Sequence, residues 1–273
     1  MHFKEKVALV TGGASGIGKE TAIQFAKHGA KVAILDINQK TLDAARDELV
    51  KVAGEICVLA FHGDVSKKES VDACIEKVIA KFGTIDYLIN CAGILRDALI
   101  PKMVEADFDA VIATNLKGVF LCTQACVKAW TKEPLEKIKA AKAANKPVPS
   151  PNEFPDKRIV NISSMAADGN MGQIAYSASK AGVLGITKTS AKELIQYNIK
   201  VHAIQPTLID TPIIGDLLTK EDGKWKKYYE GRIPLGIGKP KNVADAILWL
   251  CSEESYFMTG NVLQLNGGKL GEL

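Results

Sequence analysis

Short apolar runs alternate with longer amphipathic segments along most of the chain. The apolar runs are rich in Val, Ile, Leu and Ala, and they span residues 7–10, 32–35, 56–61, 85–89, 159–162, 201–204 and 262–265. Near-continuous apolar strands that alternate with helices are typical of a parallel sheet covered on both faces. The pattern therefore predicts one α/β domain over residues 1–273, a doubly wound parallel sheet of about seven strands with helices on both faces.

Three positions indicate where the expected helices begin and end. Ser66, with Glu69 three residues later, has the spacing of a capping box and predicts a helix start. Gly29 and Gly83 stand where a helix must end before the next strand begins.

One segment, residues 131–157, interrupts the alternation. A Lys/Ala-rich helical stretch leads into a connection that holds four of the ten prolines. Between residues 131 and 150, five lysines against two glutamates give a net charge of +3, which indicates a solvated face. We expect a surface insertion remote from chemistry, because it enters the amino end of the strand over 159–162, whereas ligands bind at carboxyl ends.

Composition narrows the class of protein. Hydrophobic residues at 47% and charged residues at 24% are ordinary for globular proteins and exclude a largely disordered chain. The net charge of +4 is scattered, so we expect no nucleic-acid partner. No apolar run approaches the roughly 18 residues of a membrane span, so we expect no membrane partner and a cytoplasmic location. The six cysteines form no C-x-x-C pair, and no metal site is expected.

A glycine-rich turn follows the first expected strand. Residues 11–18 read TGGASGIG and lead directly into a helical pattern. Glycines at 12, 16 and 18 allow a tight turn and let backbone N–H groups and a helix N-terminus approach a pyrophosphate. On its own the motif is also consistent with a simple tight turn, but its position between strand and helix favours a dinucleotide site.

An acidic residue supports that interpretation. Asp36 ends the second expected strand, 18 residues beyond Gly18, where a carboxylate can accept hydrogen bonds from an adenosine ribose. The same charge repels the 2′-phosphate of NADP, and neither Ser15 nor Ile37 supplies a cation, so NAD is the expected cofactor. The alternative role for Asp36 is a helix N-cap or a solvated turn.

Tyr176 and Lys180 lie four positions apart, on one face of an expected helix. Alone, such a pair is common. Together with residues 11–18 and Asp36, it indicates an active site.

At this point the sequence resembles the short-chain dehydrogenase/reductase family over nearly the whole chain. The resemblance rests on TGGASGIG, Asp64-Val65, Asn90 to Gly93, Asn115, the pair Ser163-Ser164, Tyr176 to Lys180, and residues 259–268, in the family's order and spacing. Residues 92–97 and 233–236 are most similar to the branch of 3-oxoacyl-thioester reductases and hydroxyacyl dehydrogenases. The resemblance implies a Rossmann-like fold and a homo-oligomer, a dimer or tetramer.

The resemblance also implies a catalytic set. Tyr176 would be the general acid/base, and Lys180 would lower the pKa of its phenol and hold the nicotinamide ribose. Asn115 would anchor a water that relays protons to Lys180, or else make an N-terminal helix hydrogen bond.

A serine would orient the substrate carbonyl and stabilise the negative charge that develops on its oxygen. Because adjacent strand residues face opposite sides, only one of the pair can do so. We choose Ser164, with Ser163 as the alternative.

The cofactor-binding residues implied by the motifs extend along the whole chain. They are Gly12, Ser15, Gly16, Ile17, Gly18, Asp36, Asp64, Val65, Asn90, Ala92, Gly93, Tyr176, Lys180, Pro206, Ile209 and Thr211. Two positions depart from the family pattern: Cys91 replaces an Asn, and Thr207 replaces a Gly beside the nicotinamide.

In the family, residues 207–240 would cover the substrate. Their cationic and aromatic members are Lys220, Lys224, Trp225, Lys226, Lys227, Tyr228, Tyr229 and Arg232. They would attract an anionic thioester or form a solvated helix face. The expected function is NAD(H)-dependent interconversion of a secondary alcohol and a ketone, with a 3-hydroxyacyl/3-oxoacyl thioester as the leading small-molecule substrate. The alternatives are a dehydrogenase of cyclic, aromatic or steroid alcohols and a catalytically dead nucleotide sensor.

Overall fold

The computed structural model describes residues 2–269, apart from the side chains of Asp216, Lys220 and Glu221. Within them the strands form one parallel sheet in the order β3-β2-β1-β4-β5-β6-β7. The strands are β1 Val7–Thr11, β2 Lys31–Asp36, β3 Val58–His62, β4 Tyr87–Asn90, β5 Lys157–Ile162, β6 Ile199–Pro206 and β7 Val262–Leu265. The predicted doubly wound α/β fold is confirmed, and its strand order reverses between β1 and β4.

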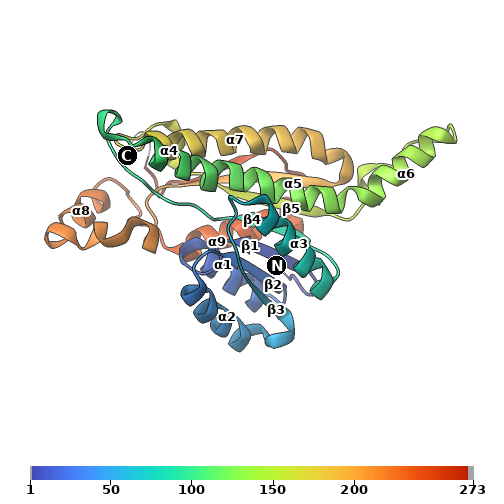
Figure 1. The fold of residues 1–273 in the computed structure, drawn as a ribbon, viewed down its shortest axis with the longest axis horizontal. Helices are drawn as coiled ribbons and strands as arrows, with labels where there is room; N and C mark the ends of the chain where they lie inside the picture. The colour runs from blue at the N-terminus through green and yellow to red at the C-terminus, as the bar shows by residue number, and fades with distance from the viewer. Residues whose placement is uncertain (1, 270–273) are drawn as a thin grey trace.

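Helices cover both faces of the sheet (Figure 1). One layer holds α1 Gly16–Lys27, α2 Gln39–Ala53 and α9 Pro240–Leu250, and the other holds α3 Lys68–Phe82, α4 Glu105–Ile112, α5 Gly118–Trp130 and α7 Ile174–Leu194. Alternate residues of β1 face the two helix layers. Ala8 and Val10 pack in the core on the side of the first layer, and Val7 and Leu9 pack in the core on the side of the second. A strand buried on both faces needs apolar residues throughout, which explains the unbroken apolar runs in the sequence.

Three boundary predictions are wrong. The fourth strand begins at Tyr87 rather than residue 85. The third strand begins at Val58 rather than residue 56, because its register places Val58 opposite Val32, and Ile56 lies before it, 81% exposed. The predicted capping box is absent: α3 begins at Lys68, and the Ser66 N–H instead donates to Asp64 Oδ1 at 2.8 Å. The helix ends at Gly29 and Gly83 are confirmed, with φ of +89° and +83°.

Helices α4 and α5 form one continuous rod joined by a π-helical turn over Ala113–Lys117. By length and composition Glu105–Trp130 could cross a membrane, contrary to the expectation that no stretch would pass that test. The apolar side chains are spread along a helix rather than in one run. Because the rod packs on α7 and α3 and contributes Leu121, Cys122 and Cys126 to the core, it has the packing of a core helix.

The segment 131–157 forms α6 Lys132–Ala143, which continues beyond α5 and projects from the body (Figure 1). Most of its side chains are exposed, including Leu135 and Val148. The return path is anchored, since Phe154 is buried and its carbonyl accepts from Asn198 Nδ2 at 2.8 Å. In Figure 1, α6 and α8 (Lys220–Glu230) lie at opposite ends of the molecule.

Candidate active site

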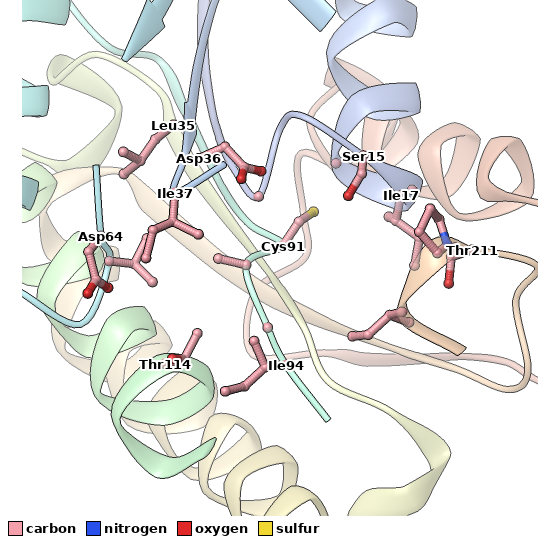
Figure 2. A pocket seen from close by; sticks show the side chains of 18 of the residues that line it. Ser15, Ile17, Leu35, Asp36, Ile37, Asp64, Cys91, Ile94, Thr114 and Thr211 are labelled. Atoms are coloured by element: carbon pink, nitrogen blue, oxygen red, sulfur yellow. The ribbon is translucent and has the colours of Figure 1, made fainter. Parts of the chain in front are cut away.

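A cavity of about 350 Å³ opens beside the carboxyl ends of β1, β2 and β4, where the strand order reverses. This is the position where doubly wound sheets bind ligands. Figure 2 shows Asp36, Asp64, Cys91 and Thr211 around this space, with Ser15 near Asp36.

The glycine loop can pack closely against itself and against the residues that follow β4 only because it lacks side chains. A Cβ on Gly12 would lie 2.8 Å from Ala92 Cα, and one on Gly18 would lie 2.2 Å from Gly12 O. Gly16 has φ +51° at the first position of α1, and Ser15, just before it, makes no capping bond with its side chain. The first N–H groups of α1 therefore remain available to an anion. Together with the glycine loop they fit a dinucleotide pyrophosphate.

Asp36 holds the loop and faces the cavity. Its Oδ2 accepts from Ala14 N at 3.1 Å and its Oδ1 from Asn38 N at 3.0 Å. The N-cap of α2 is Asn38, whose Oδ1 accepts from Thr41 N, so Asp36 is not the helix N-cap. Its bond to Asn38 N does form a local turn, the other alternative role. No lysine or arginine lines this cavity among the described residues. The arrangement suits an uncharged ribose better than a 2′-phosphate.

A second cavity of about 430 Å³ adjoins the first. Both are lined by Ile17, Cys91, Gly93, Thr211 and Ile213, so a long ligand can pass from one into the other.

The two serines at the end of β5 have different partners. Ser163 Oγ donates to Lys180 O at 2.8 Å, and only 2% of the residue is exposed. Ser164 Oγ accepts from Ala166 N at 3.1 Å and is hydrogen-bonded to Tyr176. Only Ser164 therefore has a hydroxyl proton that can be directed at a ligand beside Tyr176.

Tyr176 and Lys180 project from α7 into the second cavity. The prediction that Lys180 lowers the tyrosine pKa is wrong: burial raises the pKa of Tyr176 to about 12, and the hydrogen bond from Ser164 opposes that rise. The Lys180 amine lies 5.5 Å from the centre of the Tyr176 ring and donates to Ile162 O at 2.8 Å. Burial also lowers the pKa of Lys180 to about 8, because no carboxylate compensates its charge.

Asn115 lies in the π-helical turn and is fully buried. Its Oδ1 accepts from Ile94 N at 2.8 Å, and its Nδ2 donates to Ile94 O at 3.0 Å and to Ser179 Oγ at 3.3 Å. It lies in mid-rod, so an N-terminal helix hydrogen bond is excluded. The side chain fixes the backbone that follows Gly93, which lines both cavities.

The other implied cofactor residues divide into two groups. Those that line a cavity are Gly12, Ser15, Gly16, Ile17, Gly18, Asp36, Asp64, Val65, Ala92, Gly93, Tyr176, Lys180, Pro206, Ile209 and Thr211. Asn90 does not: it is buried and its Nδ2 donates to Asn161 Oδ1 at 2.8 Å. Its role in the structure is to join β4 to β5.

Sequence reasoning did not assign a site role to several lining residues. These are Thr114, Asp97, Asn170, Gln173 and Tyr229. Each lies within eight residues of a recognised motif or in the segment expected to cover the substrate, but loop conformation decides which of these side chains face inward.

The basic segment around α8 is mostly solvated. Tyr229 lines the second cavity, whereas the Lys226 and Lys227 side chains are exposed. Arg232 stacks on Tyr228, 3.8 Å from the ring centre. The side chain of Lys220 lies outside the described residues.

Comparisons with known proteins show the family of this chain. A family model described as Enoyl-(Acyl carrier protein) reductase matches residues 12–269. The chain is 42% identical over 270 residues to 3-oxoacyl-(acyl-carrier-protein) reductase FabG of Thermotoga maritima, covering 98% of this chain and 99% of that protein. It is 36% identical over 280 residues to (3R)-3-hydroxyacyl-CoA dehydrogenase of Canis lupus familiaris, covering 98% and 97%.

A solved structure, 3-ketoacyl-(acyl-carrier-protein) reductase from Brucella melitensis complexed with NADH, matches with a TM-score of 0.79 and 31% identity, covering 98% of this chain and 99% of that one. The fold and site thus define an oxidoreductase with a dinucleotide-type cavity. The chain belongs to the short-chain dehydrogenase/reductase family, with relatives among the 3-oxoacyl reductases and hydroxyacyl-CoA dehydrogenases, as the sequence predicted.

Proposed function

We propose that the protein interconverts a 3-hydroxyacyl and a 3-oxoacyl thioester with NAD(H). The observation that carries the cofactor choice is the Asp36 carboxylate in a cavity whose described lining holds no lysine or arginine. A 2′-phosphate about 4 Å from that carboxylate would lose on the order of 1–4 kcal/mol per charge pair. The relatives named as acting on acyl-carrier-protein and CoA substrates support the thioester.

In this proposal the dinucleotide would extend from the first cavity into the second, where its nicotinamide would supply a hydride to the substrate carbonyl carbon. Gly12, Gly16 and Gly18 receive the pyrophosphate, and Asp36 accepts from the adenosine ribose. Ile209 and Thr211 hold the carboxamide end. Tyr229 and the segment 207–240 cover the substrate.

The residues around the second cavity perform the proton transfer. Ser164 donates a hydrogen bond to the substrate carbonyl, where negative charge develops during hydride transfer. Tyr176 gives its phenolic proton to the same oxygen, which completes the alcohol, and takes it back in the reverse direction. Lys180 holds the nicotinamide ribose and replenishes the Tyr176 proton, while Asn115 keeps the Ile94 backbone in place beside it.

Cellular location and assembly complete the proposal. We place the enzyme in the cytoplasm, as a homotetramer or a dimer, as the family resemblance implies. Size measurement by light scattering in solution tests the assembly, and a monomer would contradict it.

Initial-rate measurements test the proposed reaction. NADH and NADPH should be compared with acetoacetyl-CoA, an acetoacetyl carrier protein and a simple ketone. We expect at least a tenfold preference for NADH in kcat/KM, since about 1.4 kcal/mol of repulsion suffices. Asp36→Ala should shrink the preference, whereas Asp43→Ala, an exposed acid on α2, should leave it unchanged. Equal use of both cofactors by the unmodified protein would contradict the assignment.

A further inference from the structure

The carboxylate of Asp97 is held beside the second cavity by a short chain of amides. Asn170 Nδ2 donates to Gln173 Oε1 at 2.8 Å, and Gln173 Nε2 donates to Asp97 Oδ2 at 2.8 Å. The backbones are also joined, because Ala98 N donates to Gly172 O at 2.8 Å. Asp97, Asn170 and Gln173 all line this cavity. The carboxylate is therefore fixed in direction although it lies on an exposed loop.

The second carboxylate oxygen has no partner in the described part of the chain. Asp97 Oδ1 makes no hydrogen bond there, and the neighbouring cation, Arg96, pairs with Asp107 at 3.5 Å. Asp97 lines the same cavity as Tyr176 and Tyr229, and its negative charge contributes to the raised pKa of both. An ionised carboxylate only accepts hydrogen bonds. A ligand that occupies this position should therefore present an N–H or O–H group.

We propose that Asp97 is a specificity-determining residue that accepts a hydrogen bond from the amide N–H of a pantetheine thioester. This inference rests on the proposed function. The pantetheine arm is common to CoA and carrier-protein thioesters, and its nearest amide lies two carbons beyond the sulfur. When the 3-oxo carbonyl is beside Tyr176 and Ser164, the thioester arm extends away from it along the cavity wall, and Asp97 is part of that wall.

Two small substrates isolate the amide. The acetoacetyl thioester of N-acetylcysteamine carries it, and the acetoacetyl S-pentyl thioester, of similar length, does not. In Asp97→Asn the amide oxygen can still accept from Gln173, which leaves an NH₂ group facing the cavity. Because a hydrogen bond to a charged group is lost and two donors then face each other, KM for the amide thioester should rise about tenfold or more.

Separate measurement of kcat and KM distinguishes a loss of substrate recognition from damage to the fold. In Asp97→Asn we expect kcat for both substrates, and KM for the S-pentyl thioester, to stay within about threefold. Gln173→Met, which releases the carboxylate, should raise KM for the amide thioester selectively, by less than Asp97→Asn. Asp109→Asn, an exposed acid on α4, is the matched control and should change neither KM.

Acetoacetyl-CoA and an acetoacetyl carrier protein distinguish the two sources of the arm. Asp97→Asn should raise KM for both, and the lower KM of the unmodified enzyme identifies the natural carrier. An equal change in KM for the amide and S-pentyl thioesters, or no change in either, would overturn the role of Asp97. Failure of the unmodified enzyme to reduce any thioester would instead refute the proposed function.

Discussion

Buried charges lie at both ends of the sheet, and they are arranged differently. At the amino end, Arg158 donates to Leu250 O, Ser252 O and Ser255 Oγ and pairs with Asp156 at 2.7 Å. Lys200, only 3% exposed, pairs with the same carboxylate at 3.0 Å. At the carboxyl end Lys180, 4% exposed, has a backbone carbonyl as its acceptor and no carboxylate partner among the described residues.

This difference in pairing distinguishes the charges that stabilise the amino end from the charge beside the candidate site at the carboxyl end. At the amino end the carboxylates and backbone oxygens accept the donors, so the charges hold the end of the inserted segment against the residues after α9. At the carboxyl end the unpaired charge of Lys180 is costly, and its pKa falls to about 8, close to the range in which it can exchange protons. We therefore expect substitutions at the amino end to affect stability and those at the carboxyl end to affect turnover.

The largest effect on stability is expected at the amino end of the sheet. Arg158→Met keeps the apolar stem but removes the guanidinium that donates five hydrogen bonds. The free energy of unfolding should therefore fall by about 3–5 kcal/mol. Denaturant unfolding measures this change, and the kcat of the folded fraction should be unchanged. Arg46→Met, an exposed arginine paired with Glu55, is the control and should cost about 0–1 kcal/mol. A stable Arg158→Met enzyme with reduced kcat would contradict the comparison.

A smaller effect should distinguish the two serines at the carboxyl end. Ser164→Ala removes the hydroxyl that faces Tyr176, so kcat should fall about 10²–10³-fold. Ser163→Ala removes only the bond to Lys180 O, so kcat should change by no more than a few-fold while stability falls by about 1 kcal/mol. Steady-state kinetics with thermal unfolding of both variants checks this. Equal losses of kcat would show that the two hydroxyls are not separated as the structure indicates.

The smallest effect on turnover should come from α6. Replacing residues 136–148 with a short Gly/Ser turn removes exposed chain but keeps the buried Phe154 and the Asp156 carboxylate. Because α6 and α8 lie at opposite ends of the molecule, kcat/KM should stay within a few-fold (Figure 1). Kinetics and light scattering together make the test. A hundredfold loss with an unchanged assembly would place the insertion close to the chemistry.

The order of elements could be predicted because each buried strand requires its own apolar run. Their ends were less predictable: the run that starts at Ile56 continues into the strand at Val58, yet pairing with β2 decides where β3 begins. Similarly, Ser66 and Glu69 have capping-box spacing, but Asp64 already accepts from the Ser66 N–H. Contacts with spatial neighbours thus override local sequence patterns at the ends of elements.

The site was predictable where backbone chemistry dictates the residue, as at Gly12 and Gly18. It was less so where one side chain must be oriented by another. Asn90 bonds the Asn161 side chain, and Asn115 holds the Ile94 backbone. Asp97 lines the same cavity as Tyr176 and Tyr229. These placements depend on tertiary contacts that no spacing encodes. The pKa of Tyr176 likewise reflects burial, which a Tyr-x-x-x-Lys pattern does not report.

The central claim, that the carboxyl end of the sheet performs the proton transfer through Tyr176, is tested most directly by Tyr176→Phe. The change keeps the ring and removes one oxygen, so cofactor binding should weaken by no more than one hydrogen bond, roughly 0.5–1.5 kcal/mol. Turnover should fall about 10²–10⁴-fold, as for other positioned acid/base groups. The measurement pairs calorimetric titration of NADH with the rate of acetoacetyl thioester reduction. Turnover within threefold of the unmodified enzyme would show that Tyr176 is not the acid.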